Sequence, residues 1–269
     1  MKKADWNLYL SVQNPWTSRL IGLEHFSKTR DINQIQREYD TDKYGSLLHL
    51  NSVDVEDYKK QEYLQSGLDF QSLIKFSLEE ELFEAPVSTV RSIYYALVEE
   101  VIRPYQPRQI CELGCGYGAN FPHLQSLTSD VYGGEFSHNA VEIASRFNLK
   151  VSPFNYYHLD DYQLIRENSI VFTSHSVEQL PDAQCFIDGL EKHREKIDLV
   201  VNFEPMQLKS RQTLIGALRN RYIELNDYNR NLIELLQNHP NIEVLEFRPD
   251  CIGINPLNPA CIIVWRFRK

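Results

Sequence analysis

The chain has 269 residues, of which 42% are hydrophobic, and 37 Asp and Glu against 28 Lys and Arg give a net charge of −9. This composition excludes a disordered chain, and the acidic balance excludes nucleic acid as the main partner, because phosphate binding needs clustered Lys and Arg. Apolar runs such as Tyr94–Val98 are far shorter than the about 20 residues of a membrane span, so no membrane partner is expected.

Residues 1–105 contain no convincing series of strands and are predicted to form a helical N-terminal extension. Ile32-x-x-Ile35 has helical spacing, and the last helix opens at Pro86–Thr89 and closes at Pro104. The polar and aromatic segment Arg37–Gly45 either folds over a ligand as a lid or forms a solvated helix end. Since Met1–Asn7 lack the apolar segment of a secretory signal, a cytoplasmic location is expected.

Residues 106–269 show the alternation of short strands and helices that is typical of a parallel sheet. The predicted fold is α/β: a seven-stranded, doubly wound, Rossmann-like sheet with a C-terminal antiparallel hairpin. The expected strands are residues 109–113, 131–135, 150–153, 169–173, 199–204, 242–248 and 261–268. The expected helices are residues 119–127, 138–147, 183–196 and 207–238.

Two further segments are candidates for contacts with a substrate. A helical insertion at about 207–238 carries Arg, Asn and Tyr side chains that suit a polyhydroxylated or anionic molecule, or that only cover the surface. The turn Gly253–Pro259 forms either a wall of the pocket or a bare hairpin loop.

The five cysteines are widely scattered, with no Cys-x-x-Cys pair and no His at zinc-finger spacing. They are therefore expected to be free thiols, and no metal site is predicted.

The strongest local pattern is Ile110–Gly118, a strand that runs into a Gly-x-Gly-x-Gly turn. Such a turn lets the backbone approach a bound molecule, although it is also found as a plain tight turn. Glu135 ends the next strand, where a carboxylate can accept hydrogen bonds from a ribose. Glu112, before the turn, would repel the pyrophosphate of NAD but would attract an ammonium and a sulfonium group, which favours S-adenosylmethionine.

The segment Glu112–Gly118 resembles motif I of the class I (Rossmann-like) S-adenosylmethionine-dependent methyltransferases. Glu135, Ser174–Asp182 and Glu204-Pro205 resemble later motifs of that family in the same order, over about residues 108–206 and 241–268. The resemblance implies S-adenosyl-L-methionine as cofactor. The residues expected to bind it are Glu112, Gly114, Cys115, Gly116, Tyr117, Gly118, Glu135, Phe136, Asn155, Tyr156 and Ser174.

The chain departs from the family at two positions. Asn155 stands where the family usually has an Asp for the adenine amino group, and Gln179 replaces a frequent His, while His175 lies four residues earlier. His175 is the first candidate for a catalytic base because imidazole titrates near neutrality. Glu178 and Glu204 are the other candidates, and His123 is a weaker candidate for ligand contact.

The predicted function is methyl transfer to a small acceptor, with O-transfer ahead of N-transfer. The acceptor would be a sugar, a polysaccharide precursor or a secondary metabolite, and a homodimer is possible. The alternatives are an NAD-dependent oxidoreductase and a non-catalytic module that keeps the cofactor fold. Methylation of a peptide also stays open.

Overall fold

The computed structural model of the chain describes residues 1–268, and its strands form one mixed sheet. Its ten strands lie in the order β1-β3-β2-β9-β10-β8-β7-β4-β5-β6. Their bounds are Lys2–Lys3 (β1), Leu73–Leu78 (β2), Glu81–Pro86 (β3), Gln109–Leu113 (β4), Val131–Glu135 (β5), Val151–Pro153 (β6), Ser169–Ser174 (β7), Ile197–Glu204 (β8), Ile242–Gly253 (β9) and Ala260–Phe267 (β10).

Strands β4 to β8 are parallel and confirm the part of the sheet that the βαβ pattern predicts. β4 pairs with β5 on one side and with β7 on the other, so the chain changes its direction of winding there. In open α/β sheets ligands bind at this switch point, outside the carboxyl ends of the strands. β10 lies antiparallel between β8 and β9, which confirms the predicted C-terminal hairpin.

The expectation that residues 1–105 contain no strands was wrong. β2 and β3 form a hairpin that pairs with β9 through Ser77 and Leu78, and β1 pairs with β3, so the sheet has three strands more than predicted. The hairpin buries Phe76 and Ala85 against Val90 of α6, which is the physical reason for its formation.

The helices are mostly shorter than the sequence pattern suggests. Their bounds are Trp6–Tyr9 (α1), Pro15–Leu20 (α2), Ile32–Ile35 (α3), Gln36–Tyr44 (the π-helix η1), Gly45–Leu47 (α4), Val55–Gln65 (α5), Val87–Ile102 (α6), Phe121–Leu124 (α7), His138–Arg146 (α8), Gln184–Lys192 (α9), Leu214–Leu225 (α10) and Leu232–Asn238 (α11); 3₁₀ turns span Arg103–Tyr105, Asp161–Leu164, Val177–Gln179 and Arg194–Lys196. The single helix predicted over 207–238 is two helices, because Asp227 adopts a left-handed φ of 52° between them. Among residues 1–268, no helix is both long and apolar enough to cross a bilayer.

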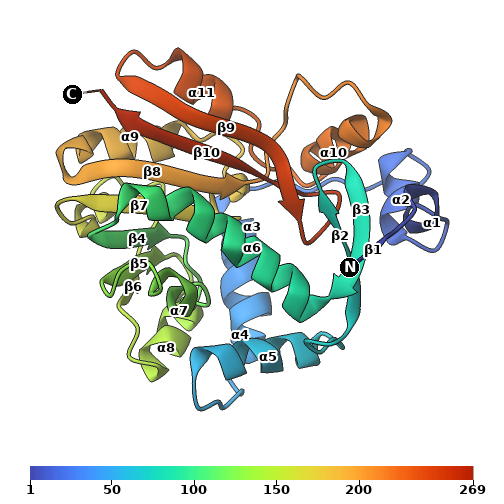
Figure 1. The fold of residues 1–269 in the computed structure, drawn as a ribbon, viewed down its shortest axis with the longest axis horizontal. Coiled ribbons are helices and arrows are strands. Elements are labelled where there is room, and N and C mark those ends of the chain that lie inside the picture. Colours follow the sequence, from blue (N-terminus) through green and yellow to red (C-terminus); the bar gives the residue numbers. More distant parts are fainter. Residues whose placement is uncertain (269) are drawn as a thin grey trace.

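Helices cover both faces of the sheet because successive residues of a strand point to opposite sides. In β10, Ile262 and Val264 pack in the cluster with α6, whereas Ile263 and Trp265 pack in the cluster with α9 and α11. Figure 1 shows α6 crossing one face of the sheet.

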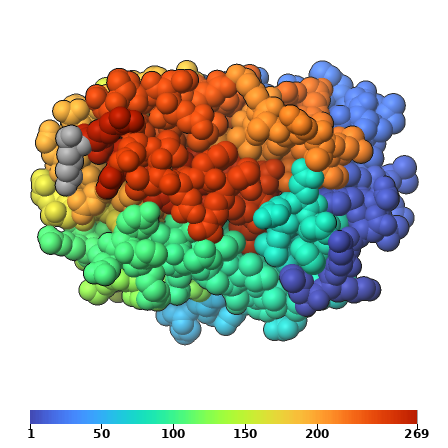
Figure 2. All heavy atoms as spheres, turned by 45° about the horizontal axis from the view of Figure 1, so that its top comes forward, coloured from blue at the N-terminus to red at the C-terminus, as the bar shows by residue number. Residues whose placement is uncertain are grey.

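The N-terminal third packs on the sheet domain at two places. Leu20 joins Tyr222 and Ile223 of α10, and Tyr44 and Tyr58 join α8 in a second cluster. In Figure 2 the N-terminal residues (blue) lie at one end of the molecule, beside α10 (orange) and the β2–β3 hairpin (teal).

A buried ion cluster holds the N-terminal hairpin to α10 and β9. Asp250 of β9 accepts hydrogen bonds from Arg211, with Nε at 3.0 Å, and from Nη1 of Arg219 at 3.1 Å. Arg219 is fully buried and also donates to the Glu79 carbonyl in the β2–β3 turn at 2.7 Å. One carboxylate therefore balances two guanidinium groups that have little access to water.

We expect Asp250→Asn to lower the free energy of unfolding by about 3 to 5 kcal/mol, because it leaves two buried guanidinium groups without a counter-charge. Urea unfolding followed by circular dichroism measures this loss. Asp198→Asn, at an exposed position of β8, is the matched control and should change the value by less than about 0.5 kcal/mol. Equal effects of the two variants would contradict this account of the cluster.

Candidate functional site

The glycine turn after β4 is held by a carboxylate from the next strand. Glu135, at the end of β5 and 6% exposed, accepts hydrogen bonds from the backbone N–H of Gly116 at 2.7 Å and of Ser137 at 2.8 Å. Gly114 and Gly116 have φ values of 71° and 56°, a backbone conformation that glycine adopts without strain. Burial raises the pKa of Glu135, and these backbone donors oppose the rise.

Glu112, in β4 just before the same turn, has one carboxylate oxygen without a hydrogen-bond partner among the described residues. Its Oε1 accepts a hydrogen bond from Nδ2 of Asn120 at 2.6 Å, whereas its buried Oε2 has no partner among the described residues. Burial raises the pKa of Glu112 to about 8, although the Asn120 hydrogen bond opposes the rise. A cationic group on a ligand would satisfy Oε2 and favour the ionised carboxylate.

The π-helix η1 lies directly over the glycine turn. Asp40 fixes it to the start of α8, where its Oδ1 accepts hydrogen bonds from Ser137 Oγ at 2.7 Å and from the Asn139 N–H at 2.9 Å. A Cβ atom added to Gly116 would lie 2.5 Å from the Tyr44 hydroxyl, so this tyrosine touches the turn. A ligand over the turn would therefore be covered by residues of η1.

Glu204, predicted as a catalytic alternative, uses both carboxylate oxygens on backbone N–H groups. It is fully buried at the end of β8, and its two oxygens accept hydrogen bonds from the N–H groups of Ser176 at 3.1 Å and Glu178 at 3.0 Å. Burial, together with the nearby Glu178 charge, raises its pKa to about 7. These bonds hold the loop after β7, in which His175 has a left-handed φ of 52°.

Glu178 organises the polar side chains of that loop. Its Oε2 lies 3.3 Å from Nδ1 of His175 and accepts from Nδ2 of Asn258 at 3.0 Å, while its Oε1 accepts from Nε2 of Gln179 at 2.8 Å. Burial alone would lower the pKa of His175, but the charge and hydrogen bond of Glu178 outweigh it and raise the pKa above its ordinary value. The turn that carries Asn258 thus supports the site without lining it.

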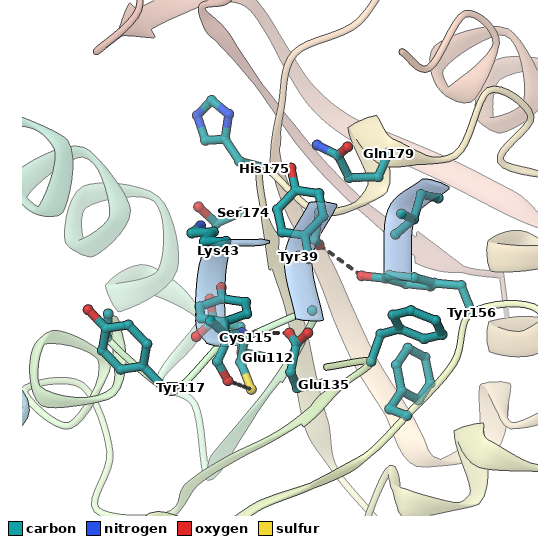
Figure 3. A pocket seen from close by; sticks show the side chains of 18 of the residues that line it. Tyr39, Lys43, Glu112, Cys115, Tyr117, Glu135, Tyr156, Ser174, His175 and Gln179 are labelled. Atoms are coloured by element: carbon teal, nitrogen blue, oxygen red, sulfur yellow. Dashed lines mark hydrogen bonds between the residues drawn. The ribbon is translucent and has the colours of Figure 1, made fainter. Parts of the chain in front are cut away.

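These groups surround a cavity of about 250 Å³. Among the side chains labelled in Figure 3, Glu112 and Glu135 lie at one end and His175 and Gln179 at the other, with Tyr39 between them. The lining residues are Ile32, Ile35, Tyr39, Lys43, Tyr44, Lys59, Glu62, Glu112, Gly114, Cys115, Gly116, Tyr117, Ala119, Asn120, Glu135, Phe136, Phe154, Asn155, Tyr156, Tyr157, Ser174, His175, Ser176, Gln179 and Leu180.

The structure brings most of the predicted site residues to this cavity, including Phe136, Asn155, Tyr156 and Ser174. Three do not line it: Gly118, whose Cβ position faces Leu149 and Phe121, and the supporting carboxylates Glu178 and Glu204. His123 is also outside, stacked on Tyr95 at 3.4 Å between ring centroids. No residue of the insertion 207–238 lines the cavity.

Several lining residues were not among the predicted cofactor or catalytic residues. Tyr39, Lys43 and Tyr44 belong to the segment Arg37–Gly45, for which a lid over a ligand was one of two expectations because of its density of polar and aromatic residues. Lys59 and Glu62 of α5 carry no such signal, because an ordinary solvated helix has the same residue types. No group of three His, Cys, Asp or Glu residues within 1–268 is arranged to hold a metal ion.

No family model and no curated protein matches the sequence. Solved structures do match. An S-adenosylmethionine-dependent methyltransferase from Anabaena variabilis is 15% identical with a TM-score of 0.50, and the match covers 91% of this chain and 99% of that one.

Magnesium protoporphyrin IX methyltransferase from Synechocystis, solved with bound S-adenosylhomocysteine, is 14% identical with a TM-score of 0.50; the match covers 89% of this chain and 100% of that one. At these identities the similarity concerns the fold. The chain has the fold of the class I S-adenosylmethionine-dependent methyltransferases.

Proposed function

We propose that the protein is an S-adenosylmethionine-dependent methyltransferase that methylates a hydroxyl group of a small molecule. The observation that carries the proposal is the buried, unpaired Oε2 of Glu112 beside a glycine turn that a second buried carboxylate, Glu135, holds in place. A ligand with an ammonium group and a ribose satisfies both carboxylates, whereas the pyrophosphate of NAD has no hydrogen to donate to Oε2 of Glu112 and is repelled when Glu112 is ionised.

The remaining residues at this end fit the same ligand. Glu135 keeps free lone pairs for ribose hydroxyls, Phe136 offers an apolar face, and Asn155 carries an amide beside Tyr156. When bound, S-adenosylmethionine supplies a methyl group on a positively charged sulfur, which needs no further activation as a leaving group. The protein has to align the acceptor, exclude water and remove one proton, and alignment alone is worth about 7–11 kcal/mol.

The candidate for removing that proton is His175, which lines the cavity. Since the carboxylate of Glu178 can only accept, it favours a proton on Nδ1 and leaves Nε2 of the neutral ring as the base. The acceptor hydroxyl would give its proton to Nε2 as its oxygen takes the methyl group in place of sulfur, which would keep the electron pair of the broken carbon–sulfur bond. His175 would then pass the proton to solvent.

We expect isothermal titration calorimetry to detect binding of S-adenosylhomocysteine but not of NADH. Glu135→Gln should weaken this binding about tenfold or more, because an amide cannot accept from both the backbone and a ribose as a carboxylate does. The exposed control Asp198→Asn should bind like the wild type. A protein that binds NADH, or neither molecule, would refute the proposed function.

Binding should also release protons at about pH 7. Glu112 is mostly protonated there because its pKa is raised to about 8, and the ligand ammonium would lower that pKa. Affinity for S-adenosylhomocysteine should therefore rise between about pH 6 and 8, by up to tenfold per unit, and level off above.

Calorimetry in phosphate and in Tris, whose ionisation heats differ, measures the protons released. Glu112→Gln should abolish the release because the amide does not titrate. Equal proton release in this variant and the wild type would assign the effect to another group.

We expect Glu178→Gln to lower the pKa of His175, since burial then acts without the charge of Glu178 and is opposed only by the more weakly acting Glu204. Titration of the histidine ring signals by NMR measures the shift. Glu191→Gln, which removes the carboxylate 3.5 Å from His239, is the control and should leave His175 unchanged. An unchanged His175 in Glu178→Gln would show that the two side chains do not interact.

A further inference from the structure

Apolar and aromatic side chains form part of the cavity wall, among them Tyr39, which Figure 3 shows near His175 and Gln179. Ile32, Ile35 and Tyr39 follow one another at helical spacing and all line the cavity, as do Tyr157 and Leu180 from other parts of the chain. Ile32 is 39% exposed and Tyr157 is 42% exposed, so this side of the cavity is open to solvent. A helical face that would ordinarily pack in a core instead borders a space for a ligand.

Gln179 places one unsatisfied polar atom at this part of the cavity wall. Its Nε2 donates to Oε1 of Glu178 at 2.8 Å, and because a carboxylate only accepts, this bond fixes which side of the amide is nitrogen. The opposite atom, Oε1, is buried and has no partner among residues 1–268, in a side chain that is only 6% exposed. A buried acceptor of this kind needs a hydrogen-bond donor from outside the protein.

Gln179 and His175 are neighbours because both bind the Glu178 carboxylate, one at each oxygen. An acceptor that meets His175 with the hydroxyl to be methylated therefore has its adjacent substituent near Gln179. The walls offer aromatic and aliphatic surface, and polar lining groups already bind protein partners: Glu62 binds Lys59 and Tyr117, and Ser174 binds Tyr94. The Arg and Asn residues of 207–238 do not reach the cavity. A sugar would lose the hydration of hydroxyls that find no replacement there.

We infer that the acceptor is a planar aromatic molecule with two adjacent hydroxyl groups. One of them is methylated at His175, and the other donates a hydrogen bond to Oε1 of Gln179. This inference rests on the proposed function and assigns its substrate class. The transfer forms a bond between the ring oxygen and the methyl carbon and breaks the carbon–sulfur bond, with the proton passing to His175.

The test uses the full chain saturated with S-adenosylhomocysteine and three probes: 2,3-dihydroxynaphthalene, 2-naphthol and methyl α-D-glucopyranoside. Calorimetry should show that the diol binds about tenfold tighter than 2-naphthol, the difference expected for one hydrogen bond to a buried acceptor. The glucoside should bind more weakly than both.

Two variants test the contacts. Gln179→Leu should remove the preference for the diol over 2-naphthol, and Ile35→Glu should weaken both aromatic probes about tenfold or more. Ile21→Glu, at an exposed position outside the cavity, is the control for Ile35→Glu and should match the wild type. Unchanged affinity for S-adenosylhomocysteine in each variant shows that the fold is intact.

The outcomes separate the two proposals. A protein that fails to bind S-adenosylhomocysteine refutes the proposed function, and the inference with it. A protein that binds it but prefers the glucoside, or binds none of the probes, overturns the inference alone. A preference for the diol that survives in Gln179→Leu overturns the role of Gln179.

Discussion

The site depends on hydrogen bonds between buried carboxylates and the backbone of the loops that leave the parallel strands. Where a strand ends, its backbone N–H groups lose their sheet partners and need other acceptors. Glu135 accepts from the turn after β4, and Glu204 accepts from the loop after β7. In both cases the carboxylate comes from the neighbouring strand, so the sheet itself sets the positions of the two loops.

This arrangement explains why acidic residues at the same edge of the sheet have different roles. Glu204 uses both oxygens on backbone donors and lies below the loop, whereas Glu112 keeps one oxygen unpaired at the cavity. Glu178 differs from both, because its oxygens bind the side chains of His175 and Gln179 and so orient them. Glu135 also has both oxygens on backbone donors, but unlike Glu204 it lines the cavity, so access to the cavity decides together with the number of partners whether a carboxylate can serve a ligand.

The sequence pattern predicts the parallel half of the fold well, because most strands there are followed by a helix; β6 is the exception, with only the 3₁₀ turn Asp161–Leu164 before β7. The β2–β3 hairpin was not predicted, because its turn at Glu79-Glu80 contains no Gly, Pro or Asn, although Glu79 adopts a φ of 51°. The break in the helix over 207–238 was missed although Asn226-Asp-Tyr-Asn229 is rich in residues that favour turns.

Within the site, residues next to the glycine turn could be placed from the motif because the strand and turn fix their geometry. The roles of Glu178 and Glu204 could not be predicted. Sequence spacing does not show that Glu204, at the end of β8, lies beneath the loop after β7 that carries Glu178. Gln179 was recognised only as a departure from a family pattern. Its importance depends on a hydrogen bond to Glu178, which orients the amide and is visible only in three dimensions.

The wide turn of η1 decides which of its side chains can border the cavity together. A π-helix closes its hydrogen bonds between residues five apart, as the Gly45 N–H does with the Asp40 carbonyl, so Tyr39 and Tyr44 face the same side. In an α-helix each residue rotates the chain by about 100°, so residues five apart would point in directions about 140° apart. Loss of one residue between the two tyrosines would place them four apart, a spacing that an α-helix keeps on one face, so a homologous chain can lose the π turn and still keep both rings at the cavity.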